Sequence, residues 1–295
     1  MSYSPLRTWD GTRWRPSPPP PSASTNPAAG SNSTATTLAV SPVSLSGSGT
    51  VTLTATVSGT PTGSVVFEYL SGTTWREIST DTGSPWTATK MINGATSFRA
   101  RYLGNGTDQP STSATKTVST KTLQTFTKTY AATGTGSYSE SGTKRTDSDH
   151  IFQGLVSSVW DEQRSVIVFG TQIQSDLADA HDITKVELFL NALHWGQNSG
   201  GTVCIRTINN TVVPSTWAGA NDISTYDATS WSTKTGAKWC DISSIKGAAS
   251  DWKAGGTKKG IALWAFSGLA EYYGYFAGNG ETNEPQLRIT YRKYV

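Results

Sequence analysis

Aromatic side chains are the residues of this chain whose types and spacing suggest binding chemistry. The sequence has 11 Trp and 11 Tyr, and such rings stack on the apolar faces of sugars while their polar tips form hydrogen bonds. Several fall outside the obvious strands, in the turn NALHWGQNSGG and in the segment 209–235. The candidate glycan-binding residues are His194, Trp195, Trp217, Tyr226 and Trp231.

Polar residues accompany these rings. Asn, Asp, Thr and Gly are interspersed through the segment 209–235, a mixture that suits ligands with both polar groups and apolar faces. Asn198, Asn209 and Asn221 are the candidate polar neighbours. The alternative interpretation, which the sequence leaves open, is that the rings cap the ends of a β-sandwich.

Catalytic motifs are missing from the sequence. There is no Gly-x-Ser-x-Gly elbow, no phosphate-binding glycine loop and no His-Glu-x-x-His among the three histidines. The nearest carboxylate pairs are Asp147 with Asp149 and Asp161 with Glu162. Such a pair can cleave a glycosidic bond, but in a Ser-rich turn it favours a solvated loop or a weak calcium site. We expect no enzyme, no catalytic residues, no metal and no cofactor.

Cys204 and Cys240 are the only two cysteines. They are too few for a disulfide framework and lack the spaced partners of a zinc site. Both lie in apparent strands of one domain, so they are either two buried thiols or a disulfide. A bridge requires Cα atoms within about 7 Å of each other.

The composition indicates the elements that must position these residues. Only 15% of the residues are charged, whereas 37 Ser and 45 Thr suit short strands better than helices. The net charge of +3 excludes a polybasic nucleic-acid arm, and no apolar run reaches the ~20 residues of a membrane span. The start of the chain has no apolar signal-peptide region. We expect an all-β protein with no nucleic-acid partner, no membrane insertion and no signal-peptide export.

The first 35 residues divide into two segments. Residues 16–35 are dominated by Pro, Ser, Ala and Asn and are predicted to be a linker. Residues 1–15 contain Asp10-Gly11, which predicts a two-residue turn between strands that carry Trp9 and Trp14. Trp9, Asp10, Gly11 and Trp14 are therefore candidate docking residues. A frayed terminus is the alternative, because an isolated hairpin is marginal in water.

Residues 36–120 show strict strand alternation. Val51, Leu53, Ala55 and Val57 alternate with threonines, and further strands are separated by Gly, Pro, Asn and Ser turns. Six or seven short strands in this span predict a β-sandwich. The runs SGSGTVTLTATVSG, GSVVFEYLSGTTW and SFRARYLGNGT resemble bacterial immunoglobulin-like domains, and the resemblance implies a spacer without catalytic residues.

Residues 125–295 are predicted to form a larger jelly-roll sandwich. One flanking helix is expected where Ile242, Ile245, Ala249 and Trp252 follow a helical apolar stripe, with Asp241 or Ser243 as N-cap. The fold class is therefore all-β, an immunoglobulin-like β-sandwich followed by a larger jelly-roll β-sandwich with one flanking helix.

The second domain also carries family likenesses. DSDHIFQG, QRSVIVFG and KWCDISSIKGAASDW resemble DNRLRE-type jelly-roll domains of surface proteins. KRTDSDHIFQG, VELFLNALHWGQNSGGT and YYGYFAGNG more closely resemble the C-terminal domains of minor tail proteins from actinobacterial phages, and WDGTRW is similar to a segment that opens many phage tail proteins. This family is structural, so the resemblance transfers no catalytic positions.

These likenesses imply a virion structural protein, a minor tail or fibre protein with a host-facing C-terminal domain. Tail localisation is favoured over the capsid. The expected partners are other virion proteins, through the N-terminal segment, and a host cell-surface glycan, with assembly as a homo-oligomer, a trimer being favoured. The alternatives are a capsid head fibre or decoration protein, a carbohydrate-binding module of a bacterial surface protein, and a glycan depolymerase with a carboxylate pair in a groove.

Overall fold

The structure is a computed structural model that describes residues 7–9, 14–16, 32–59, 61–146, 149–157, 160–220, 222–265 and 273–295. For 7–9, 14–16, 156, 157, 160 and 222–225 it describes the backbone alone. Strands predominate throughout, which confirms the predicted all-β sandwich class. The chain divides into two compact units, Met1–Lys121 and Thr122–Val295.

An N-terminal hairpin pairs β1 (Arg7–Trp9) with β2 (Trp14–Pro16). Trp9 lies directly opposite Trp14. The predicted two-residue turn is therefore wrong, because this register leaves more than two residues between the paired tryptophans. The predicted docking residues Asp10 and Gly11 lie outside the described residues, as do the side chains of Trp9 and Trp14.

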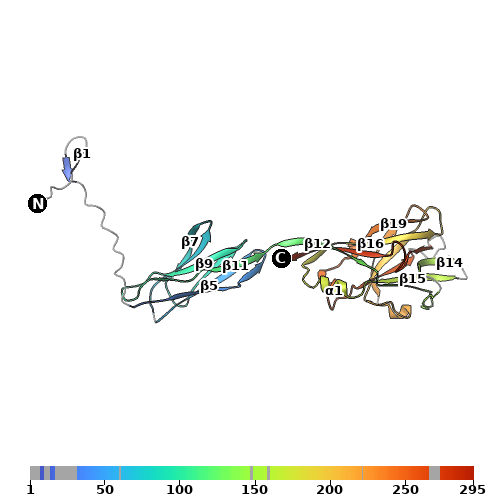
Figure 1. Ribbon diagram of the computed structural model, residues 1–295, viewed down its shortest axis with the longest axis horizontal. Helices are drawn as coiled ribbons and strands as arrows, with labels where there is room; N and C mark the ends of the chain where they lie inside the picture. Colours follow the sequence, from blue (N-terminus) through green and yellow to red (C-terminus); the bar gives the residue numbers. More distant parts are fainter. Residues whose placement is uncertain are drawn as a thin grey trace. The chain divides into compact units, whose positions relative to one another are not determined.

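Unit 1 is a sandwich of two sheets with immunoglobulin-like strand order (Figure 1). The smaller sheet contains β3 (Thr36–Ser41), β5 (Gly49–Val57) and β8 (Trp86–Ile92). The larger contains β4 (Ser44–Ser46), β11 (Lys116–Lys121), β9 (Thr96–Tyr102), β6 (Val65–Ser71) and β7 (Thr74–Asp81), with β10 (Ser111–Thr112) beside β9. All the strand pairs are antiparallel except β4 with β11, which is parallel.

The core of unit 1 follows the sequence pattern closely. Val51, Leu53, Ala55 and Val57 are all buried, whereas the threonines between them face outward. Alternate side chains of a strand point to opposite sides of the sheet, so this single strand contributes four apolar groups to one core. Trp86 closes the core, and its indole Nε1 donates a hydrogen bond to a loop carbonyl at 3.1 Å.

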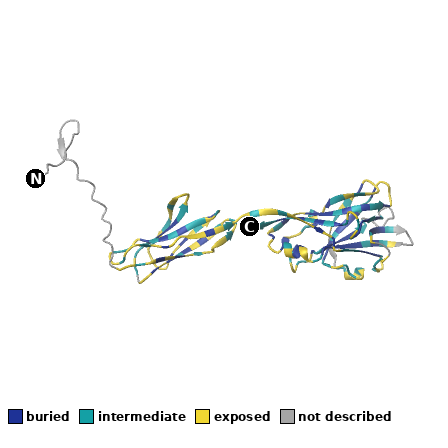
Figure 2. Ribbon diagram, in the orientation of Figure 1, coloured by how far each residue is buried: buried dark blue, intermediate teal, exposed yellow. Residues whose placement is uncertain are grey.

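Unit 2 is one curled sheet that folds over its own core (Figure 2). The first layer of the curled sheet contains β12 (Leu123–Ala131), β22 (Gln286–Tyr294), β16 (Asp182–Trp195), β19 (Gly236–Asp241), β21 (Gly274–Phe276) and β14 (Ile151–Ser157). The second layer contains β13 (Gly134–Tyr138), β15 (Trp160–Val168), β20 (Gly260–Ala265), β17 (Thr202–Ile208) and β18 (Asp222–Ser230). Pairing of β14 with β15 joins the two layers.

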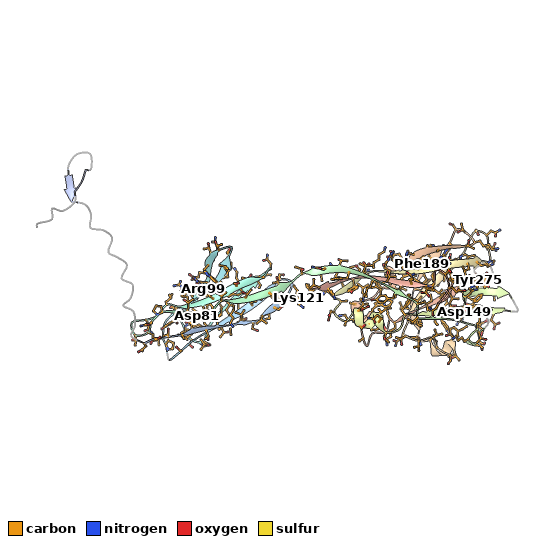
Figure 3. The ribbon with its side chains drawn as sticks, viewed as in Figure 1. Asp81, Arg99, Lys121, Asp149, Phe189 and Tyr275 are labelled. Atoms are coloured by element: carbon orange, nitrogen blue, oxygen red, sulfur yellow. The ribbon has the colours of Figure 1, made fainter. Side chains whose placement is uncertain are left out.

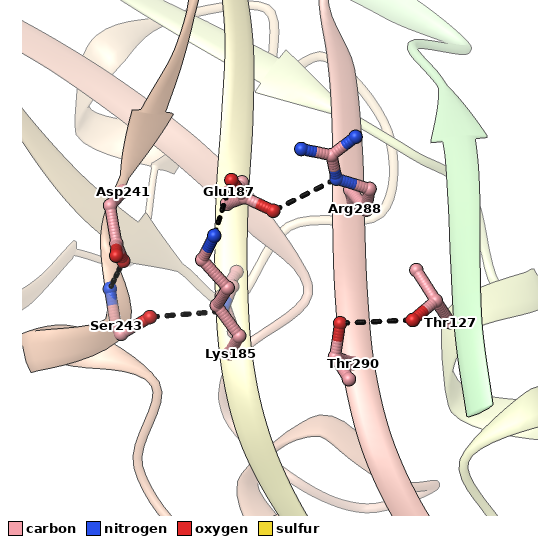
Figure 4. Close-up of polar contacts among 8 residues, drawn as sticks. Thr127, Lys185, Glu187, Asp241, Ser243, Arg288 and Thr290 are labelled. Carbon is pink, nitrogen blue, oxygen red and sulfur yellow. Dashed lines mark hydrogen bonds and ion pairs between the residues drawn. The ribbon is translucent and has the colours of Figure 1, made fainter. Parts of the chain in front are cut away.

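Polar side-chain contacts connect neighbouring strands of the first layer (Figure 4). Glu187 of β16 accepts hydrogen bonds from Arg288 of β22 and from Lys185, both at 2.8 Å. Farther along, Thr127 of β12 and Thr290 of β22 share a hydrogen bond of 3.1 Å. These contacts supplement the backbone pairing that runs along β12, β22 and β16.

The predicted single flanking helix is wrong in its length. Its sequence forms a 3₁₀ turn, η2 (Ser243–Ile245), and a one-turn helix, α2 (Ala249–Trp252). Gly247 between them has a φ of 62°, which ends the first turn because that backbone conformation cannot continue a right-handed helix. The four residues of the apolar stripe are nevertheless all buried in the core. Two further short helical segments, α1 (Gln172–Asp176) and η1 (Trp217–Gly219), were not predicted.

Candidate functional site

Five ring side chains gather on the outer face of β14, β21 and β16. We call them the aromatic row: His150, Phe152, His194, Tyr273 and Tyr275. Strand pairing brings them together, because Tyr275 of β21 lies opposite Phe152 of β14 on one side and His194 of β16 on the other. Phe152 is buried and the other four rings are half-buried.

The immediate chain neighbours of the row explain why it faces outward. Ile151, Trp195 and Phe276 each adjoin a row residue in sequence and are fully buried in the core. Successive side chains of a strand point to opposite faces, so the row residues point away from that core. Three segments far apart in the sequence thus form one surface.

Tyr275 is the centre of a three-ring stack. Its ring centroid lies 5.1 Å from that of His150 with an interplanar angle of 19°, and 5.3 Å from that of His194 with an angle of 12°. Phe152 and Tyr273 form a second near-parallel pair at 6.3 Å. The row combines imidazole nitrogens and phenol hydroxyls with apolar rings. Such a surface can form hydrogen bonds with hydroxyl groups while it contacts apolar faces of a ligand.

Charged groups border the row. The Arg145 guanidinium lies 4.2 Å from the Phe152 ring centroid, and His150 Nε2 lies 3.0 Å from a Glu281 carboxylate oxygen. Burial lowers the pKa of His194, and the positive charge of Lys234 lowers it further, so the neutral imidazole is favoured. Burial raises the pKa of the Tyr273 phenol, which keeps its proton available for donation.

The row lies at one end of unit 2. The chain enters the unit at Thr122, which exchanges backbone hydrogen bonds with the terminal Val295. Figure 3 shows Tyr275, together with the nearby Asp149, toward the end of the unit opposite to this entry point. A ligand at the row would therefore bind far from the connection to unit 1 within the chain.

Two of the predicted glycan-binding residues belong to the core instead. Trp195 is 0% exposed and Trp231 is 6% exposed, and their ring centroids lie 5.7 Å apart. Neither ring can stack on a sugar, so both assignments are wrong. Trp195 is buried for two reasons. Strand β16 continues through this residue, where the sequence predicts a turn. Gly201 and Gly274 on neighbouring segments have no side chains and so leave space for the indole.

The predicted residues Trp217 and Tyr226 lie at the second layer of unit 2, which contains β20 and β18. Trp217 is half-buried on η1 and packs edge-on against Trp264, with ring centroids 4.8 Å apart. Tyr226 on β18 is 48% exposed. Of the five predicted residues, therefore, His194 belongs to the aromatic row and Tyr226 and Trp217 belong to a separate surface. The row residues that sequence reasoning missed are His150, Phe152, Tyr273 and Tyr275.

Of the two alternatives for Cys204 and Cys240, the structure has the two buried thiols, because both cysteines are free and buried, and the candidate disulfide is not formed. Val203 and Ile205 belong to the main core, so Cys204 between them faces the opposite side of its sheet. Cys240 lies inside that core. The two thiols therefore lie on opposite sides of the layer formed by β15, β20, β17 and β18. Burial raises the pKa of both thiols, to about 11 for Cys240, which keeps them protonated and unreactive near neutral pH.

Asp161 and Glu162 do not form a site, and the pair of Asp147 with Asp149 lies partly outside the described residues. Asp161 is exposed and Glu162 is half-buried on adjacent positions of β15, which face opposite sides. Asp149 is exposed, and Asp147 lies outside the described residues. No three His, Cys, Asp or Glu side chains within the described ranges are placed to hold a metal ion. None of the described helices is long and apolar enough to cross a membrane.

The predicted polar neighbours are dispersed. Asn198 is exposed in the turn after β16, and Asn209 is half-buried with its side-chain oxygen enclosed. Asn221 lies outside the described residues. Comparison with known proteins adds no relative, because no protein-family model matches the chain and no curated protein matches it.

Proposed function

We propose that this chain is a structural protein of a phage virion, a minor tail or fibre protein whose second unit binds a glycan on the host cell surface. The resemblance of KRTDSDHIFQG and YYGYFAGNG to minor tail proteins supports the virion assignment. An immunoglobulin-like sandwich followed by a larger sandwich suits a spacer that presents a binding domain. Tail placement is favoured over the capsid.

The aromatic row is the single observation that carries the binding role. It brings Tyr275 and two imidazoles together on one half-exposed surface, at the end of unit 2 opposite to the chain entry. Sugars offer apolar ring faces bordered by hydroxyl groups, which match rings with polar tips. A single such site binds weakly, and several copies on one particle would raise the avidity by about two to four orders of magnitude.

The location of the protein on purified particles tests the virion assignment. An antibody or gold label against unit 2 is expected to decorate tails in electron micrographs. Decoration of the capsid shell would instead support a head fibre or decoration protein. Particles that lack the chain altogether, with the protein found on the bacterial surface, would overturn the virion assignment in favour of a bacterial carbohydrate-binding module.

Binding of the oligomeric protein to host cell walls tests the aromatic row. The double variant His194→Ala/Tyr275→Ala is expected to bind about tenfold more weakly than the wild type, since each ring contact contributes about 0.5–1.5 kcal/mol. Trp75→Ala, which removes a half-buried aromatic ring from unit 1, is the matched control and should bind normally. Circular dichroism would verify folding of each variant. Equal binding by the double variant and the wild type would remove the row from the proposal.

Oligomerisation on the particle is a further expectation of this function. The N-terminal hairpin and the Pro-rich segment would dock on other virion proteins, and several chains docking together gain avidity, so we expect a trimer. Light scattering of the full chain, together with copy counting on particles, measures this. A monomer in both settings would contradict it.

A further inference from the structure

A groove of unit 2 lies between two loops that are distant in the sequence. One loop, 139–146, follows β13, and the other, 213–218, leads into η1. The groove has a volume of about 740 Å³. We call it the hydroxyl groove, because five of its described lining residues carry hydroxyl groups: Ser141, Thr143, Thr146, Ser215 and Thr216.

Hydrogen bonds between the two loops fix the walls of the hydroxyl groove. The Trp217 amide donates a hydrogen bond of 2.9 Å to the Gly142 carbonyl. The phenol of Tyr138, a fully buried residue, donates one of 2.6 Å to the Pro214 carbonyl. An isolated antiparallel bridge also joins the two loops. The walls are therefore positioned before a ligand binds, which reduces the ordering cost of binding.

Gly136 of β13 explains how Lys144 comes to line the groove. A Cβ atom on Gly136 would lie 2.7 Å from Val213 Cγ1 and 3.2 Å from Lys144 Cε. Because glycine lacks this atom, the alkyl stem of Lys144 packs close to the backbone of β13, and the side chain is half-buried. Long cationic side chains commonly bury the stem in this way and keep the charged group in contact with solvent. Lys144 therefore brings an ammonium group to a groove that is otherwise lined by hydroxyl and apolar groups.

The polar groups of the hydroxyl groove are hydrogen-bond donors that have no acceptor within the described chain. Lys144 forms no ion pair there, and the hydroxyl groups of Thr146, Ser215 and Thr216 form no side-chain hydrogen bond. None of the described lining residues is acidic. An ammonium group and several free hydroxyl groups suit an anion with more than one oxygen atom.

The number of donors favours phosphate over carboxylate. A phosphate ester has a negative charge and several acceptor oxygens, so it can accept hydrogen bonds from one ammonium group and several hydroxyl groups at once, whereas a carboxylate has two oxygens. Ligand sites commonly have volumes of about 300–1,000 Å³, so the groove also has room for an alcohol joined to the phosphate. Val213 and Pro214 provide apolar contacts for its carbon atoms.

We propose that the hydroxyl groove binds a phosphate group, which contacts Lys144, Ser215 and Thr216, and that the rest of the groove accommodates the polyol or sugar that carries it. The groove shares no residue with the aromatic row. The inference goes beyond the proposed function, because it depends on neither the aromatic row nor the virion assignment.

Calorimetric titration of the full-length protein at low salt tests the ligand class. Glycerol phosphate oligomers supply a phosphate ester, inorganic phosphate supplies the anion alone, oligogalacturonic acid supplies carboxylates, and polyglycerol is neutral. We expect the glycerol phosphate oligomer to bind about tenfold or more tightly than oligogalacturonic acid and polyglycerol, with an affinity that falls as salt increases. Weaker binding of inorganic phosphate would identify the ester as the ligand, and equal binding would identify free phosphate. Oligogalacturonic acid or polyglycerol binding as tightly as the phosphate probes would overturn the proposal.

Variants test the residues. Lys144→Gln is expected to lower the affinity for the glycerol phosphate oligomer about tenfold, because it removes a hydrogen bond between charged groups. Lys144→Arg keeps the charge and should lower it about threefold or less. Thr216→Val replaces the hydroxyl group with a methyl group and should lower it several-fold. Lys253→Gln, at a half-buried lysine of unit 2 outside the groove, is the matched control and should leave the affinity unchanged.

Circular dichroism would verify the folding of each variant. Thr216 is exposed, so its variant should fold even if a variant of Lys144 does not. Unchanged affinity in Thr216→Val and in every folded variant of Lys144 would overturn the assignment of these residues.

The two proposals can fail separately. If the His194→Ala/Tyr275→Ala variant loses binding to cell walls while Lys144→Gln binds the glycerol phosphate oligomer as tightly as the wild type, the aromatic row stands and the phosphate site falls. If binding of the oligomer depends on Lys144 while the double variant binds cell walls normally, the phosphate site stands and the aromatic row falls.

Discussion

Burial divides the candidate aromatic residues into two groups with different roles. Trp195 is fully buried, whereas Tyr226 is 48% exposed. A Cβ atom on Gly201 or Gly274 would lie 2.2 Å or 2.7 Å from Trp195 Cε3, so the two glycines enclose the indole. Trp195 is therefore a packing residue, and Tyr226 remains available to a ligand.

Substitution of Trp195 is expected to destabilise unit 2. Trp195→Ala should lower the free energy of unfolding by about 3–5 kcal/mol because it leaves a cavity in a close-packed core. Tyr226→Ala should change it by about 0.5 kcal/mol or less, as for most surface positions. Urea denaturation followed by fluorescence or circular dichroism measures both. A small effect of Trp195→Ala would contradict its assignment to the core.

The stability that the contact between β16 and β22 contributes is expected to depend on pH, because it involves the carboxyl group of Glu187. Hydrogen bonding from Arg288, opposed by burial and assisted by Lys185, lowers the pKa of the Glu187 carboxyl below its usual range. Because the pKa is lower in the folded state, this carboxylate stabilises the fold above its unfolded pKa of about 4.3. That stabilisation is lost as the pH falls through the folded pKa.

Glu187→Gln is expected to lower the free energy of unfolding at pH 7 by about 1–3 kcal/mol, the range for hydrogen bonds to charged groups. The difference from the wild type should shrink as the pH falls below about 4, because the wild-type carboxyl becomes neutral as well. Thermal unfolding from pH 3 to 7 measures this, with the exposed Glu140→Gln as control. A difference that stays constant with pH would contradict the role of the charge.

The two units have separate hydrophobic cores. One core is built on Val51, Phe67 and Trp86 in unit 1, and the other on Leu188, Trp195 and Trp252 in unit 2. In unit 2, the first strand β12 pairs along its length with the last strand β22, so the two chain ends of the unit are held together by backbone hydrogen bonds. Each unit therefore has a hydrophobic core of its own, as independent folding requires, and unit 2 also pairs its first strand with its last.

Residues 122–295 alone are expected to fold and to unfold cooperatively. Their melting temperature should lie within about 3 °C of the corresponding transition in the full chain, a change equivalent to about 1 kcal/mol for a domain of this size. Calorimetry of the full chain should show two transitions. A single transition in the full chain, or an isolated unit 2 that does not fold, would contradict separate folding.

Local sequence pattern determined the class of the fold. The alternation of Val51, Leu53, Ala55 and Val57 with threonines already defines a strand with one buried face, and the abundance of Ser and Thr disfavours helices. The apolar stripe from Ile242 to Trp252 correctly marked buried residues, but the conformation at Gly247 divides it into two short turns. In these regularly spaced apolar segments burial follows from residue type and period, so the sequence is sufficient to predict which of their residues are buried.

Only the tertiary structure decided which aromatic residues are available to a ligand. Tyr275 meets His150 and His194 because β21 pairs between β14 and β16, and those three strands are distant in the sequence. Arg164, Arg206 and Trp264 likewise meet through pairing of separate strands. The exposure of these side chains and the residues that they contact depend on the register between distant strands, which a local sequence pattern does not contain. For that reason the sequence places Trp195 in a loop, whereas the fold places it in the core.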